Sequence, residues 1–86
     1  NVNFEPIELS AQTFEQQVVA KDEENVKNNQ TWFVMFYASW CGNCMKLMPA
    51  WKDFASKYSG KGFIIAQVDC QTNWRICHRY EVNAYP

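Results

Sequence analysis

The apolar and polar positions of this chain predict strands and helices that alternate along its length. Phe4–Leu9 alternates weakly between apolar and polar residues, which predicts a short first strand. Ser10 is a candidate N-cap, and Thr13–Ala20 has the spacing of a helix. Residues 21–31 are charged and polar, so we expect either a ragged helix end or a loop there.

The middle of the chain is patterned more strongly. Trp32–Ala38 is almost wholly apolar, as expected of a strand that is covered on both faces in a mostly parallel sheet. Between Gly42 and Tyr58, apolar side chains recur at the spacing of one helix face. Pro49 removes one amide donor inside this helix, so we expect a kink there. Gly60 and Gly62 then end the helical pattern.

The last part of the chain repeats the alternation. Phe63–Asp69 predicts another apolar strand, and Asn73–Tyr80 predicts a short helix with Thr72 as a possible cap. Val82–Tyr85 begins an extended segment that runs into Pro86. Strand and helix in strict alternation indicate the α/β class, with parallel strands joined by right-handed crossovers.

The large apolar side chains are expected to pack the interior. We place Leu47, Met48 and Trp51 in the core, on the inner face of the long helix. Trp32 and Trp74 are expected to be partly buried packing residues.

Composition sets the outer limits of function. The 86 residues form one domain at most, and 48% of them are apolar, which indicates a folded chain. The net charge is −1 and no basic block is present, so we expect no contact with nucleic acid or an anionic membrane. No apolar run approaches the roughly 18 residues of a membrane span. The sequence starts at Asn1 without a signal-like segment, so we interpret it as an excised domain or a processed product.

Two cysteines stand where the apolar strand passes into the long helix. The thiolate is the reactive form of cysteine, and the free amides at a helix start favour negative charge, so Cys41 should ionise readily. Cys44 lies one turn further on, where it can close a disulfide with Cys41 and release a captured substrate. The sequence therefore predicts a thiol–disulfide exchange site. A structural disulfide and half of a zinc site are the alternatives.

A second cysteine pair follows the third predicted strand. Cys70 and Cys77 allow a structural disulfide, two buried free thiols or a second redox pair. A zinc site made from all four cysteines is disfavoured, because this second pair is spaced too widely for a metal knuckle. His78 is expected at the surface. Asn29 begins a glycosylation sequon in a polar loop, and four cysteines in so short a chain indicate an oxidising compartment.

Several sequence blocks carry a family resemblance that spans residues 32–86. They are Phe-Tyr-Ala-Ser-Trp-Cys-Gly-Asn-Cys at 36–44, Lys-Leu-Met-Pro-Ala-Trp at 46–51, Val-Asp-Cys at 68–70 and Tyr-Glu-Val-Asn-Ala-Tyr-Pro at 80–86. In order and spacing they resemble thioredoxin-fold domains of the protein disulfide isomerase family. The second cysteine pair resembles that of the thioredoxin domains in the endoplasmic-reticulum DnaJ-linked disulfide reductase and, with a different gap, in the quiescin sulfhydryl oxidases.

The resemblance implies a role for each matching residue. Cys41 would be the attacking thiol and Cys44 the resolving thiol, with Gly42 and Asn43 between them. Trp40 would flank the site, where it either contacts substrate or shields the disulfide.

The resemblance also gives roles to the end of this sequence. Pro86 would be the cis-proline that faces the disulfide and turns the Tyr85 backbone toward an extended substrate. Relatives continue beyond this proline with two antiparallel strands and a helix. We therefore expect a thioredoxin-like fold truncated after Pro86, whose cover comes from the rest of a longer protein or from another chain.

Three positions depart from the family pattern. A buried carboxylate is usual six residues before the first cysteine, where this chain has Met35, and its usual lysine partner is here Gln67. Loss of both avoids an unpaired buried charge. Because that carboxylate takes the proton of Cys44, we expect slower turnover, with water or another group as the acceptor. Asn43 replaces a histidine, so we expect a less oxidising site than in an isomerase.

These observations together predict a protein thiol–disulfide oxidoreductase of reductase or isomerase type. Its partners would be cysteine-containing client proteins in the endoplasmic-reticulum lumen or another secretory compartment. No metal or cofactor is expected in this domain, and a flavin would belong only to another domain of the parent protein. The alternative is a thioredoxin-like module that binds clients or partner domains through Trp40 and Pro86.

Overall fold

A small parallel sheet forms the centre of the protein, as seen in a computed structural model that describes residues 5–86. Strands β1 (Ile7–Leu9) and β2 (Thr31–Tyr37) both pair in parallel with the central strand β3 (Phe63–Asp69). The predicted apolar strands are therefore confirmed, and β3 has its expected bounds. Phe4, where the first predicted strand began, lies outside the described residues.

The helical segment after β1 begins earlier than predicted and then changes its winding. Ser10 is the N-cap, as expected, and it forms a reciprocal capping box with Thr13 that fixes the helix start at Ala11. The polar stretch 21–31 was expected to be a ragged end or a loop, but most of it is a further helix. The elements are α1 (Ala11–Phe14), the π-helical turn η1 (Glu15–Val19) and α2 (Asp22–Lys27).

The long helix α3 (Gly42–Tyr58) matches its predicted bounds, and Pro49 lies within it. Helix α4 (Trp74–Arg79) is shorter than predicted. Asn73, and not Thr72, holds its N-cap position, but the Asn73 side chain makes no capping bond to α4. Its side-chain oxygen instead accepts the Ala11 N–H at 2.9 Å. This bond joins the starts of α1 and α4 on one side of the sheet.

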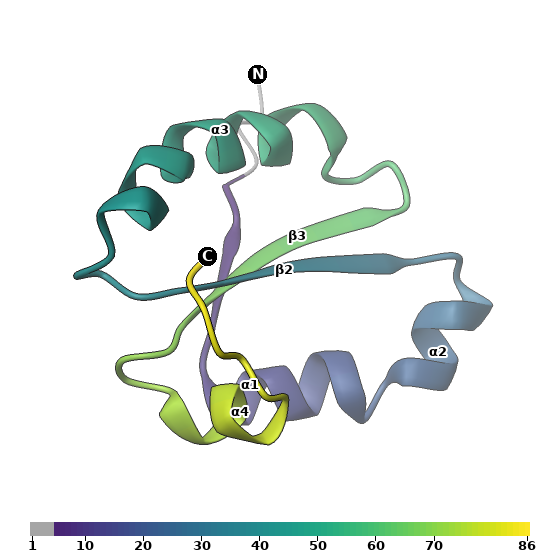
Figure 1. Ribbon diagram of the computed structural model, residues 1–86. Coiled ribbons are helices and arrows are strands. Elements are labelled where there is room, and N and C mark those ends of the chain that lie inside the picture. The colour runs from purple at the N-terminus through teal and green to yellow at the C-terminus, as the bar shows by residue number, and fades with distance from the viewer. Residues whose placement is uncertain (1–4) are drawn as a thin grey trace.

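The helices cover the sheet from both sides (Figure 1). Helix α3 lies over one face, and the other helices lie over the opposite face. Since alternate strand residues point to opposite faces, each face has its own buried cluster. Between α3 and the sheet, Met35 and Tyr37 of β2 pack with Cys44 of α3. The larger cluster on the other face contains Leu9, Phe14, Ala66, Val68, Cys70, Ile76 and Cys77.

Two predicted packing residues are exposed instead. Leu47 is 37% exposed because the inward stripe of α3 runs through Cys44, Met48 and Trp51 and leaves Leu47 beside it. Trp74 is 60% exposed because it starts a short helix whose inner face is made by the following residues. Trp51 itself fastens α3 to the sheet, since its indole N–H donates to the Ala66 carbonyl at 3.2 Å.

The chain after α4 returns toward the point where β2 meets α3. Figure 1 shows this yellow segment running from α4 past the sheet to the C-terminus. Residues 82–86 form no regular strand or helix, and the Tyr85–Pro86 peptide bond is cis, as the resemblance implied. No helix in the described part of the chain has the length and apolar character needed to cross a lipid bilayer.

Candidate active site

Cys41 is the N-cap of the longest helix. It has an extended backbone conformation at the end of the β2–α3 loop, and its sulfur accepts the backbone N–H of Cys44 at 3.3 Å. A helix start leaves such amides without backbone partners, so the cysteine sulfur takes the place that a serine or aspartate oxygen usually fills. The sequence places a reactive atom where local charge favours its anion.

The two thiols differ in exposure. Cys41 is only partly buried, whereas Cys44 is 0% exposed and packs against Met35 and Tyr37. An incoming disulfide can therefore reach the sulfur of Cys41 but not that of Cys44. This asymmetry suits one thiol to attack and the other to resolve.

The pKa values of the two thiols are shifted in opposite directions. The pKa of Cys41 is lowered, chiefly because the side chain and then the backbone N–H of Cys44 donate to its sulfur. The pKa of Cys44 is raised, first by burial and then by its hydrogen bond to Cys41. At neutral pH the outer sulfur is the better nucleophile, and the inner one holds its proton.

We expect iodoacetamide to alkylate Cys41 of the reduced protein at least about tenfold faster than Cys44 at pH 7. A lowered pKa means that the Cys41 thiolate persists below the ordinary cysteine value of about 8.5 and is lost only as the pH falls further. Mass spectrometry across a pH series measures both rates. Unfolding in urea should make the two cysteines react alike, and equal rates in the folded protein would contradict the expectation.

The segment before Pro86 lies against the exposed thiol. The Cys41 sulfur is 3.6 Å from the Tyr85 carbonyl oxygen, to which it donates when protonated. Trp40 is 68% exposed and meets the Tyr85 ring edge-to-face, with centroids 5.7 Å apart. Gly42 and Asn43 are exposed on the first turn of α3, and a side chain at Gly42 would meet nothing within 4 Å. The structure thus brings Trp40, Cys41 and Tyr85 together, with the buried Cys44 one helical turn behind Cys41.

The second cysteine pair belongs to the other side of the sheet. Cys70 and Cys77 form a disulfide with their Cα atoms 5.8 Å apart, and they are 4% and 3% exposed. They pack in the cluster beneath α1 and α4, whereas Cys41 and Cys44 belong to the cluster beneath α3. His78 is exposed. Among residues 5–86 no three histidine, cysteine or acidic side chains are grouped as metal ligands.

A polar network near Cys44 was missed by the sequence reasoning. The Tyr37 hydroxyl donates to both carboxylate oxygens of Glu8, at 2.9 and 3.1 Å, and the Gln67 amide donates to one of them at 2.9 Å. The only sequence signal was the isolated Glu8 between Ile7 and Leu9 in a short alternating strand. That pattern does not reveal which residues Glu8 meets across the sheet.

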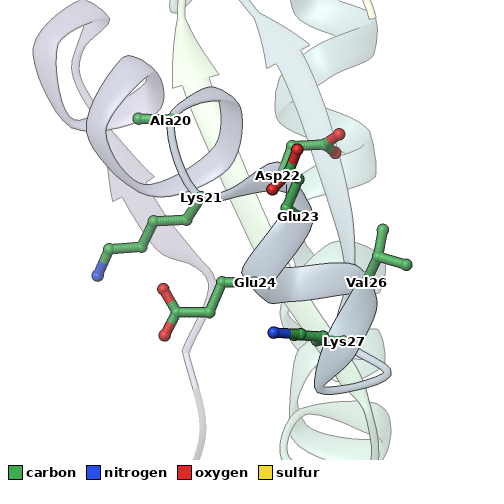
Figure 2. Close-up of a pocket in the computed structure, with 7 residues that line it drawn as sticks. All are labelled: Ala20, Lys21, Asp22, Glu23, Glu24, Val26 and Lys27. Atoms are coloured by element: carbon green, nitrogen blue, oxygen red, sulfur yellow. The ribbon is translucent and has the colours of Figure 1, made fainter.

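One hollow lies elsewhere, away from Cys41 and Cys44. It measures about 620 Å³ and is lined entirely by residues of the η1–α2 junction and α2, from Ala20 to Lys27. Figure 2 shows Lys21 and Glu24 extending to one side of the helix and Val26 to the other. Because these side chains do not converge on one point, the hollow has no set of groups to hold a ligand.

Comparison with known proteins assigns a family. The thioredoxin family profile matches residues 5–86. Protein disulfide-isomerase 2-3 of Arabidopsis thaliana is 35% identical over 80 residues, which cover 93% of this chain and 16% of that protein. DnaJ homolog subfamily C member 10 of Xenopus laevis is 36% identical over 80 residues, which cover 93% of this chain and 9% of that protein.

Solved structures give the same result. The Trx4 domain of ERdj5 superposes with a TM-score of 0.78 at 32% identity, covering 96% of this chain and 66% of that one. Full-length ERdj5 matches with a TM-score of 0.81 at 30% identity, covering 94% of this chain and 11% of that one. The sequence thus spans only a small part of most of these proteins.

Proposed function

This chain belongs to the thioredoxin family, and we propose that it exchanges disulfides with client proteins through Cys41 and Cys44. One observation carries the proposal: a partly exposed cysteine sulfur caps helix α3 and accepts the N–H of a second, buried cysteine. A structural cysteine pair has no need of a lowered pKa on its exposed member.

The proposed reaction moves two electrons from the dithiol to a client. The Cys41 thiolate attacks a client disulfide, forms a mixed disulfide and displaces one client sulfur as a thiolate. Cys44 then loses its proton and attacks the Cys41 sulfur, which displaces the second client sulfur. The products are a Cys41–Cys44 disulfide and a reduced client. The exchange takes place between sulfur atoms and uses no cofactor, and its reversal oxidises the client.

We propose reduction or isomerisation as the main direction. The pKa of Cys41 is lowered by neutral donors at the helix start, and Asn43 adds no positive charge beside it. A weakly stabilised thiolate keeps the dithiol a better electron donor than one paired with a protonated imidazole. The redox equilibrium of this pair with glutathione measures the direction.

A passive binding module is the second candidate. Trp40 is 68% exposed beside Tyr85, and such an aromatic pair next to an extended segment suits the capture of an unfolded client. In that case contact with the aromatic surface, and not the exchange of sulfurs, would be the function.

Trapping separates the two candidates. In Cys44→Ser the mixed disulfide on Cys41 has no resolving thiol, so we expect covalent adducts with insulin to accumulate at least about tenfold over wild type. Non-reducing electrophoresis detects the adducts, and the Cys41→Ser/Cys44→Ser double variant supplies the background. If Cys44→Ser shows only that background, the domain is a binder.

We also propose a secretory compartment, such as the endoplasmic-reticulum lumen, as the site of action. The buried Cys70–Cys77 disulfide supports it, because lasting disulfides are rare in reducing compartments. Cysteine-containing proteins would be the clients. Relatives in which this sequence covers only 9–16% of the length support further domains as partners.

A further inference from the structure

One motif of the sequence has no part in the proposed exchange. Asn29, Gln30 and Thr31 form an Asn-x-Thr sequon, the acceptor motif of N-linked glycosylation, and no other such triplet occurs in the 86 residues. Its middle residue is not proline, which the motif excludes at that position. The folded structure shows whether a glycan here has room and where it would stand relative to Cys41.

The sequon forms the turn between α2 and β2. The Asn29 N–H donates to the Val26 carbonyl of α2 at 3.1 Å, which closes the end of that helix. Asn29 has a φ of 54°, a left-handed conformation that asparagine adopts more readily than most residues. The side chain of the nearby Asn25 donates to the Gln17 carbonyl at 3.2 Å, but this turn is fixed through its backbone.

The side chains that the motif requires are accessible. Asn29 and Thr31 are both exposed, and so is Gln30 between them. Thr31 is the first residue of β2, and its backbone N–H donates to the Gly62 carbonyl at 2.9 Å. Helix α2, which precedes the turn, contains no buried residue. A glycan on the Asn29 amide nitrogen therefore has solvent around it and displaces no core side chain.

The sequon and the redox site lie at opposite ends of one strand. Strand β2 runs from Thr31 to Tyr37, and the loop that carries Cys41 leaves its far end. At about 3.3 Å per residue, the strand alone separates the two by about 20 Å. Figure 1 shows the α2–β2 turn and the β2–α3 loop on opposite sides of the molecule. A glycan at the turn is thus attached far from the sulfur that clients must reach.

We propose that Asn29 is an N-glycosylation site, an inference that rests on the secretory compartment proposed above. The sugar donor is an oligosaccharide joined to a lipid pyrophosphate, and a transferase of that compartment catalyses the reaction. The Asn29 amide nitrogen forms a bond to the anomeric carbon of the first sugar and loses one proton to solvent. The bond from that carbon to the pyrophosphate oxygen breaks, and the lipid pyrophosphate leaves.

Turn geometry accounts for only part of the motif. A left-handed position after a helix end favours glycine or asparagine, which is reason enough for Asn29 in an unmodified protein. The start of a strand favours β-branched residues, and valine meets that preference as well as threonine does. The hydroxyl of Thr31 is therefore the group that separates a glycosylation site from a simple turn.

Translation of the full chain behind a secretory signal peptide, with microsomes present, tests the assignment. We expect wild type to gain the mass of one glycan, which peptide N-glycosidase removes, leaving an aspartate at position 29. Asn29→Gln and Thr31→Val should stay unmodified. Thr31→Ser keeps the motif, and Asn28→Gln removes only the neighbouring exposed amide, so both should be glycosylated like wild type.

Protection from added protease identifies the chains that entered the microsomes. Wild type that is protected but gains no mass overturns the inference, as does a glycan that persists in Thr31→Val. Insulin reduction is measured separately, on protein made in bacteria and on glycosylated protein from a secretory host. We expect equal rates, and a slower glycosylated form would contradict the placement of the glycan far from Cys41. If neither form reduces insulin, the proposed exchange fails and the glycosylation site is unaffected.

Discussion

Cys41→Ser will lower the rate of insulin reduction by dithiothreitol to that of the reaction without protein. A hydroxyl in place of the thiol has almost no anionic form at neutral pH and cannot form the mixed disulfide. Because the buried Cys44 cannot reach an external disulfide, it does not replace the lost nucleophile. We expect the catalysed rate to fall by at least about a hundredfold, measured by the turbidity of the released insulin chains.

The matched control places a serine elsewhere on the same helix. Ala50 is exposed on α3 and belongs to neither buried cluster, so Ala50→Ser should keep the wild-type rate. Thermal unfolding of both variants tests whether the fold is retained. Equal turbidity rates for Cys41→Ser and wild type would remove the enzymatic proposal.

Reduction of the Cys70–Cys77 disulfide will destabilise the domain by about 2–3 kcal/mol, because the bridge closes a short loop in the unfolded chain. The two cysteines are separated by seven positions in sequence and are buried in the larger core cluster. Such a loss is a large share of the roughly 5–15 kcal/mol that holds most native proteins together. With a slope of about 1–1.5 kcal/mol per molar urea, the unfolding midpoint should fall by about 2 M.

The experiment isolates this bridge in a Cys41→Ser/Cys44→Ser background, where it is the remaining cysteine pair. Urea unfolding of this one variant is compared with and without reductant, so both measurements are made on the same sequence. A further Cys70→Ala/Cys77→Ala variant should show no response to the reductant. Unchanged midpoints, with thiol labelling to prove reduction, would show that the bridge does not stabilise the fold.

The fold was predictable where a strong pattern ended on a clear boundary. Helix α3 and strand β3 have their predicted bounds, because long apolar stripes end at Gly42, Gly60 and Gly62. The helix after Ser10 was misplaced by two residues, since a hydrogen bond with Thr13 sets its start and apolar spacing does not show it. The exposure of Trp74 depends on how α4 docks, which local sequence does not encode.

Without the family resemblance, only those site residues that are close together in the sequence could be predicted. The positions of Cys41 and Cys44 follow from one strand and one helix that are adjacent in sequence. Glu8 reaches the same region through the register of three strands, and a slip of one residue would turn it to the opposite face. Residues 59 positions apart, such as Glu8 and Gln67, meet only in the folded protein.

The placement of the two cysteine pairs on opposite faces of the sheet protects the domain from its own reaction. A thiolate that attacks client disulfides would also attack any internal one within reach and scramble it. Here a layer of backbone separates the Cys41 sulfur from the Cys70–Cys77 cross-link. The proposed exchange would thus leave the Cys70–Cys77 bridge of the domain's own scaffold intact.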